Sequence, residues 1–160
     1  MVNNVSNSSS GCGMGSRMKV LEERVNGYLN RMGVEPRRSP DGLYLFKYGS
    51  TVVMMSLLED EYGTYVRCAS TLLKDFNMTS DLAARLLRLN AEVRFGAFLL
   101  FDDNTLSFAA TILGDNLDYE ELRQTLEYVA KTSDDYDDVL QQEIGGKKAS
   151  DILQEAENFS

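Results

Sequence analysis

Residues 115–143 hold most of the net charge of this chain and its longest helical pattern. The segment contains ten acidic residues against two basic ones, so it accounts for −8 of the formal net charge of −9. Within it, apolar and small side chains recur at alternating intervals of three and four residues, which places them on one face of a helix. These are Tyr119, Leu122, Leu126, Val129, Ser133, Tyr136 and Leu140. The chain must therefore fold so that a long helix can bury this face.

Both ends of this helix are marked in the sequence. Asp118 is followed three positions later by Glu121, an Asp version of the capping box, and Gly145-Gly146 supplies a C-terminal stop. A helix over residues 118–144 is roughly 40 Å long, about the width of a domain of this size. The first helical segment of the chain is mildly basic, so opposite charges favour packing of the two helices near each other.

The rest of the chain alternates between helical and β-type patterns. Helical spacing runs from Arg17 to Met32, and a second helix follows Thr79, whose side chain suits an N-cap. Five runs are rich in β-forming residues and are bounded by turn-forming ones. They are residues 43–48, 51–58, 64–73, 94–101 and 105–113. The predicted fold class is α+β, in the order α-β-β-β-α-β-β-α, with an antiparallel sheet packed by helices.

The length of 160 residues predicts a single domain. Residues 1–16 are mostly Asn, Ser and Gly with scattered Val and Met, a composition too polar to offset the entropy lost on ordering, so we expect a disordered tail there. The predicted domain spans residues 17–146, and residues 147–160 form a polar C-terminal tail.

The acidic composition disfavours several classes of partner. A net charge of −9 leaves little basic surface for nucleic acids or anionic membranes. No run approaches the ~18 apolar residues of a membrane span, and residues 2–8 lack the apolar core of a signal peptide. Cys12 and Cys68 lie in the tail and in a predicted strand, so they do not indicate a disulfide framework. We expect a soluble protein of the reducing cytoplasm.

The sequence offers little for catalysis. It contains no histidine, which removes the commonest general base and rules out Ser-His-Asp and Cys-His arrangements. Cys68 lies in a predicted buried strand, where a thiol is ordinarily a small core residue. Gly11, Gly13 and Gly15 imitate a phosphate-binding loop only by number, with no preceding strand and no Lys-Ser or Lys-Thr after them. We predict no catalytic residue and no cofactor.

A metal site is the alternative that the acidic segment suggests. Asp134 and Asp138 stand four residues apart and share a helical face, as ligands of a hard cation do. A solvated acidic face explains the same two residues and is the favoured interpretation. A metal-dependent enzyme that uses these carboxylates stays open as an alternative.

Two neighbouring predicted strands carry the candidate binding surface. Residues 51–58 are apolar on both sides and uncharged, so they lie centrally in the sheet or are covered by a partner. Burial in an ordinary core is the simpler explanation for them and for the aromatic side chains of the preceding strand. If helices cover only one side of the sheet, these aromatics and two adaptable methionines meet another chain. The candidate protein-binding residues are Tyr44, Phe46, Tyr48, Met54 and Met55.

The C-terminal half resembles a known family. The residues that carry the resemblance are Leu89-Asn90, Phe95-Gly96-Ala97-Phe98, Asp102-Asp103, Leu117-Asp118-Tyr119-Glu120-Glu121-Leu122, Val129-Ala130 and Asp134-Asp135-Tyr136-Asp137-Asp138. They resemble the YbjN family, described as candidate bacterial sensory transduction regulators, whose fold resembles the type III secretion chaperones. The resemblance covers about residues 18–151 and is strongest from Leu82 onward. It implies a chaperone-type α/β sandwich, commonly dimeric, with peptide or protein binding as its activity.

The leading hypothesis is a cytoplasmic, non-enzymatic module that binds a protein or peptide and acts as a homodimer. Its role would be that of a sensory transduction regulator or of a secretion-chaperone-like protein. The hypothesis rests on the absent histidine, the concentrated acidity, the apolar sheet and the family resemblance. A metal-dependent enzyme and a structural subunit of a larger complex are the alternatives.

Overall fold

A computed structural model describes residues 14–148 of the chain. Three helices and five of its strands follow the predicted order α-β-β-β-α-β-β-α, so the predicted fold class is confirmed. The helices are α1 (Met14–Met32), α2 (Ser80–Glu92) and α3 (Tyr119–Ile144). The predicted strands are β2 (Tyr44–Tyr48), β3 (Thr51–Glu59), β4 (Thr64–Lys74), β5 (Ala97–Leu100) and β6 (Leu106–Leu113).

Two short strands and one helix end differ from the predicted boundaries. β1 (Arg37–Arg38) and β7 (Lys147–Lys148) have two residues each, too few to produce a periodic pattern in the sequence. β7 therefore begins inside the predicted polar tail of residues 147–160. Helix α1 begins at Met14, three residues earlier than predicted. The remaining parts of the two predicted tails, residues 1–13 and 149–160, lie outside the described residues.

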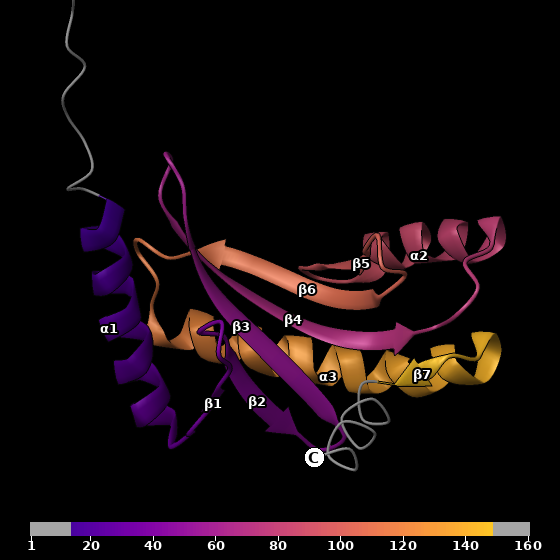
Figure 1. Ribbon diagram of the computed structural model, residues 1–160, viewed down its shortest axis with the longest axis horizontal. Coiled ribbons are helices and arrows are strands. Elements are labelled where there is room, and N and C mark those ends of the chain that lie inside the picture. The colour runs from indigo at the N-terminus through magenta and orange to yellow at the C-terminus, as the bar shows by residue number, and fades with distance from the viewer. Residues whose placement is uncertain (1–13, 149–160) are drawn as a thin grey trace, which may run out of the picture.

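The seven strands form one antiparallel sheet in the order β1-β2-β3-β4-β6-β5 (Figure 1). β7 is off this path and pairs with the last residues of β4, where Lys148 lies opposite Leu73. Along the same edge of β4, the pairing with β3 ends where Val53 lies opposite Ser70. β7 thus pairs with the part of β4 that β3 leaves free.

Helices α1 and α3 pack against one face of the sheet. In Figure 1, α3 passes behind β3 and runs along β4, and it contacts β3, β4 and β6. Met55, Cys68 and Ala110 lie opposite one another on these three strands, and all three are buried. The apolar stripe predicted for the last helix meets them there, because Leu122 and Val129 belong to the same buried cluster. The core therefore lies between this face and the two helices.

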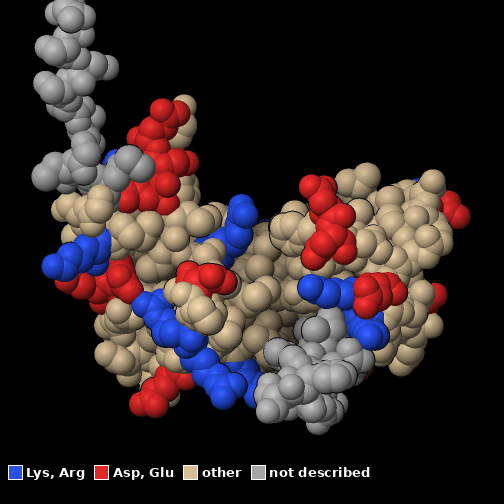
Figure 2. Space-filling view, in the orientation of Figure 1, with Lys and Arg blue, Asp and Glu red and all other residues tan. Residues whose placement is uncertain are grey.

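The opposite face of the sheet, here called the open face, carries no helix within residues 14–148. At its centre, Met54, Ala69 and Ala109 lie opposite one another. The strand positions of this face, taken from the pairing register, are Leu45, Lys47, Val52, Met54, Ser56, Leu58, Tyr65, Arg67, Ala69, Thr71, Ala97, Leu99, Ser107, Ala109, Thr111 and Leu113. Both charged residues among them, Lys47 and Arg67, are cationic, and uncharged residues fill most of the middle of the view in Figure 2.

Helix α2 lies beside β5, the strand at one edge of the sheet. It begins as predicted at Thr79, whose hydroxyl accepts a hydrogen bond from the backbone N of Leu82. Near its end, Asn90 Oδ1 accepts a hydrogen bond from the backbone N of Phe98 at 2.6 Å, and Asn90 Nδ2 donates to the Phe98 carbonyl at 3.4 Å. The side-chain amide thus takes the place of a neighbouring strand at this point of the edge.

Helix α1 contacts the start of α3, as the opposite charges of the two segments suggested. Two of its arginines contact carbonyl oxygens and an aromatic ring here. Arg24 Nη1 donates to the carbonyls of Gly114 at 3.0 Å and Asp115 at 2.6 Å. Arg31 lies over the ring of Tyr119. The loop before α3 is held in place by these contacts.

Candidate functional site

A pocket of about 450 Å³ opens where the end of α1, strands β2 and β3 and the start of α3 meet. Four elements line it, at the part of β2 that β1 leaves unpaired, because β1 pairs only with Tyr44 and Leu45. The lining residues are Met32, Val34, Glu35, Phe46, Lys47, Tyr48, Val53, Tyr119, Arg123, Leu126 and Glu127. The pocket is therefore built from segments that are far apart in the sequence.

The floor of the pocket is apolar. Phe46 and Val53 lie opposite each other on β2 and β3, point to the helix side and are buried. Leu126, from the stripe of α3, is half-buried beside them. Tyr48 is 54% exposed and Val34 is 37% exposed, so apolar surface continues to the mouth of the pocket. Such a floor favours an apolar group of a ligand.

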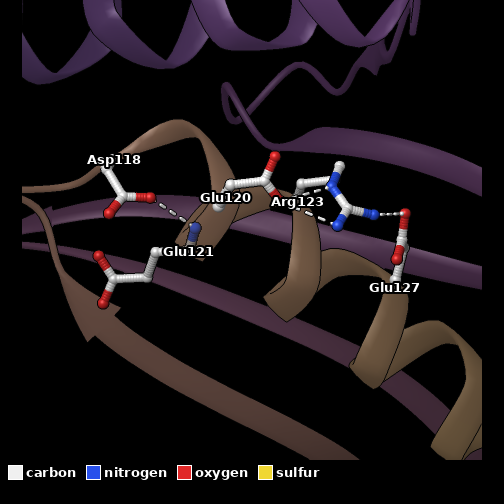
Figure 3. Close-up of polar contacts among 5 residues, drawn as sticks. All are labelled: Asp118, Glu120, Glu121, Arg123 and Glu127. Carbon is white, nitrogen blue, oxygen red and sulfur yellow. Dashed lines mark hydrogen bonds and ion pairs between the residues drawn. The ribbon is translucent and has the colours of Figure 1, made fainter.

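The rim on the α3 side carries a guanidinium held by two carboxylates (Figure 3). Arg123 donates from Nε and Nη2 to Glu120 Oε2 at 3.0 and 2.9 Å, and from Nη1 to Glu127 Oε1 at 2.6 Å. The hydrogen bonds that Arg123 donates to Glu120 and then to Glu127 raise the pKa of Arg123. Asp118 caps the helix as predicted, since its Oδ1 accepts from the backbone N of Glu121 at 2.7 Å. The first turns of α3 therefore hold the rim charges in fixed positions.

The rim at the junction of the helices is aromatic. The ring of Tyr119 stands edge-on to Tyr28, with 5.9 Å between centroids, and the Arg31 guanidinium lies over it at 3.8 Å. Tyr28 donates from its hydroxyl to the Leu117 carbonyl at 3.2 Å. With Lys47 and Glu35 also at the mouth, the rim offers both signs of charge and hydrogen-bonding groups around an apolar floor. This arrangement can hold an apolar side chain and contact the polar backbone beside it.

The five residues predicted to bind a protein do not share one surface. Tyr44 and Met55 are in the core, with 1% and 0% of their surface exposed, and this burial corrects their assignment to an exposed surface. Phe46 is also buried but forms part of the pocket floor, and Tyr48 lies at its mouth. Met54 is half-exposed at the centre of the open face. Neighbours on a strand face opposite sides, so Met54 and Met55 could not share a surface.

Burial also acts on two titratable groups of the core, Tyr44 and Cys68. It raises the pKa of the Tyr44 hydroxyl, which donates to Asn26 Oδ1 at 3.0 Å. It raises the pKa of the Cys68 thiol to about 12. A thiol with so high a pKa holds almost no thiolate near neutral pH, so Cys68 is a core residue as predicted. Cys12 lies outside the described residues.

The carboxylates of the metal alternative are placed on α3. Asp134 Oδ1 accepts hydrogen bonds from Ser50 Oγ at 3.0 Å and Thr51 Oγ1 at 3.5 Å, which ties the helix to the β2–β3 turn. Asp138 also has an interaction partner. Within residues 14–148, no group of three or more His, Cys, Asp or Glu side chains could hold a metal ion. Asp134 thus has a structural role in this fold.

Sequence reasoning did not find most of the pocket. Met32 and Leu126 were assigned to helical stripes, and Val53 to an apolar strand, so each had a signal for burial but none for a shared cavity. Val34 follows the end of α1, and Tyr119 is the first residue of α3. The helical periodicity of a sequence is weakest at helix ends. The pocket exists because the end of α1 and the start of α3 meet beside β2 and β3, which is a property of the packing.

A comparison with protein families identifies the family of the chain. The family model TY-Chap1, described as T3SS (YopN, CesT) and YbjN peptide-binding chaperone 1, matches residues 19–152. The chain belongs to the TY-Chap1 family. This membership confirms the predicted resemblance to YbjN and the secretion chaperones, and it makes the chain a peptide-binding-chaperone-like module.

Solved structures share the TY-Chap1 fold at low sequence identity. A chain of the ExsC–ExsE complex is similar, with a TM-score of 0.58 and 15% identity, and the match covers 78% of this chain and 95% of that chain. YbjN from E. coli is similar, with a TM-score of 0.55 and 13% identity, and the match covers 77% of this chain and 93% of that chain. A chain from the complex of the Yersinia pestis type III secretion chaperone SycH with a fragment of YscM2 has a TM-score of 0.54 and 12% identity. The match covers 72% of this chain and 98% of that chain.

Two further findings concern this TY-Chap1 chain. No curated protein sequence matches it significantly. None of the helices within residues 14–148 combines the length and apolar character needed to cross a membrane.

Proposed function

We propose that this chain holds an extended or helical segment of another protein, with one or more apolar side chains of that segment in the pocket between α1, β2 and α3. It acts without catalysis, as a regulatory or secretion-chaperone-like protein of the cytoplasm. The observation that carries the proposal is the apolar floor of Phe46, Val53 and Leu126 beneath a charged rim, in a chain of a peptide-binding chaperone family.

The chemistry of the rim supports a peptide more than an apolar small molecule. Lys47, Arg123, Glu35 and Glu127 place both signs of charge at the mouth. Peptide backbone and flanking polar side chains supply donors and acceptors to both signs, whereas an apolar small molecule leaves these groups without new partners. Exposed Tyr48 offers a ring that packs on an apolar side chain and a hydroxyl that bonds its backbone.

A non-enzymatic role is supported by the titratable groups. The chain has no histidine, and the Cys68 thiol is buried with its pKa raised to about 12. Arg123 is paired with two carboxylates, and Asp134 is bonded to the β2–β3 turn. None of these groups is arranged as a nucleophile with an adjacent base.

A homodimer is part of the same proposal. Large apolar side chains are exposed on α2 and around the end of edge strand β5: Leu87 is 72% exposed, Leu100 50% and Phe101 47%. Apolar groups gathered at a sheet edge favour association with another chain. Light scattering across a range of concentrations tests this, because the dimer should persist at micromolar concentration, and Leu87→Glu should shift the protein toward monomer. A strict monomer removes the homodimer from the proposal.

The binding site is tested with two tyrosine variants. Tyr48→Asp places a charge at the mouth of the pocket, and Tyr62→Asp makes the same change at the β3–β4 turn, where Tyr62 is 81% exposed. Proteins captured from native cells by the unaltered chain should be lost with Tyr48→Asp and kept with Tyr62→Asp. Overlapping peptides of a captured protein then give the affinity by calorimetry. Equal affinities for all three proteins would exclude the pocket as the binding site.

A further inference from the structure

The direction of β7 brings the end of the described chain up against β3. β7 is antiparallel to β4 and runs from Lys147 opposite Lys74 to Lys148 opposite Leu73. Farther along that edge of β4, the place is taken by β3, whose Val53 lies opposite Ser70. A strand can continue at most two residues past Lys148 along β4, because β3 pairs with β4 from Ser70 onward.

Only one side of the sheet has room for the chain beyond this point. On the helix side, the end of α3 fills the space next to β7: Leu140 is fully buried, and Ile144 packs against the core. On the other side lies the open face, which no helix of the described residues covers. Met54 lies at its centre, opposite Ala69 and four residues along β4 from Leu73.

The sequence after Lys148 has the pattern that such a face accepts. Ala149, Ile152, Leu153, Ala156 and Phe159 are spaced by three, one, three and three residues, which places them on one side of a helix. The acidic residues of the same segment are Asp151, Glu155 and Glu157, and it has no basic residue. The charges on the open face, Lys47 and Arg67, have the opposite sign.

We propose that residues 149–160 bind the open face of their own chain as a short amphipathic helix. Its apolar side covers Met54 and the small residues Ala69 and Ala109, and its carboxylates lie toward Arg67. Twelve helical residues span about 18 Å. Four strand residues from Leu73 to Ala69 span about 13 Å, so the segment reaches the centre of the face from Lys148. This proposal does not depend on the peptide pocket, which lies on the other side of the sheet.

A single tryptophan tests the proposal, because the chain contains none. In the full-length Leu153→Trp protein, the emission should be shifted to the blue relative to the same protein in denaturant, and acrylamide should quench it several-fold less than free tryptophan. Adding Met54→Glu should move the emission to the red and restore quenching. Adding Val20→Glu instead, the matched change at an exposed position of α1, should change neither the emission wavelength nor the quenching by acrylamide.

Each other outcome overturns the proposal. A solvent-exposed emission from the start means that the segment is not docked, and an emission unaffected by Met54→Glu means that it docks elsewhere. An emission that moves to the red on hundred-fold dilution assigns the face to the segment of a second copy. Since Met54 is partly buried, Arg67→Glu at an exposed position gives a second variant, and it should also increase quenching if the acidic segment lies there.

Discussion

The guanidinium carbon of Arg31 lies 3.8 Å from the centre of the Tyr119 ring. This contact joins the last turn of α1 to the first turn of α3, beside the mouth of the pocket. Opposite charges favoured packing of α1 near α3, and Arg24 of α1 donates to carbonyl oxygens of the loop before α3. The junction of the helices is therefore held by contacts that do not need the carboxylates of α3.

A double-mutant cycle measures the contribution of this junction. Arg31→Ala and Tyr119→Leu should show a coupling free energy of ~0.5–1 kcal/mol, the range of an exposed cation–π contact. Urea unfolding of the two single variants, the double variant and the unaltered protein gives the coupling. A cycle of Arg88→Ala with Tyr119→Leu should give none, because Arg88 lies on α2. Equal coupling in the two cycles would contradict the assignment.

Two glycine-to-alanine changes should have opposite effects on stability. At Gly114, an added Cβ would lie 2.5 Å from Thr64 Oγ1, 2.9 Å from the Thr64 carbonyl carbon and 3.0 Å from Leu21 Cδ2. We expect Gly114→Ala to lower the free energy of unfolding by about 1–3 kcal/mol. At Gly27, inside α1, nothing lies within 4 Å, so Gly27→Ala should raise it by ~0.5–1 kcal/mol.

Chemical denaturation of both glycine variants is the measurement. If Gly114→Ala were as stable as the unaltered protein, the close approach of the β6–α3 loop to β4 would be wrong.

Asn90 should protect the edge of the sheet. Asn90→Ala removes both hydrogen bonds to Phe98 and leaves that backbone without a partner, which should cost about 1–3 kcal/mol of stability. It should also increase aggregation on mild heating, since an unpaired edge strand recruits other chains. Glu92→Ala, an exposed change on the same helix, is the control for thermal unfolding and light scattering. Identical curves for the two variants would argue against this role.

Burial of Cys68 should make stability fall at high pH. The folded thiol has a pKa of about 12, raised from an ordinary value of 9.0. The unfolded thiol ionises first, so its contribution to stability is complete below pH 9.0 and is lost as the pH rises toward 12. In a Cys12→Ser background, the stability advantage of Cys68 over Cys68→Ala should shrink over this range in urea unfolding. A constant difference across the range would contradict the burial of Cys68.

The order of elements could be predicted because each long element carries its own periodicity. The stripe of α3 and its Asp118 cap set its start within one residue. The two-residue strands were not predictable, because β7 forms only where β4 extends beyond β3, and that depends on the register of other strands.

The candidate site was less predictable than the fold. Alternation placed Tyr44, Phe46 and Tyr48 on one side of a strand, which the pairing register agrees with. The alternation could not show which side of the strand the helices cover. It also could not show that β2 becomes more exposed from Tyr44 to Tyr48, where the strand passes the edge of the helix layer. The pocket depends on this boundary between covered and uncovered strand.

The most direct test is amide-shift mapping of the isotope-labelled protein with a peptide from a captured partner. The proposed function predicts that the largest shifts on titration occur at Val34, Tyr48 and Leu126, around the pocket, and that Tyr48→Asp abolishes them. Largest shifts at Met54 and Arg67 on the open face, or at Leu87 on α2, would contradict binding in the pocket.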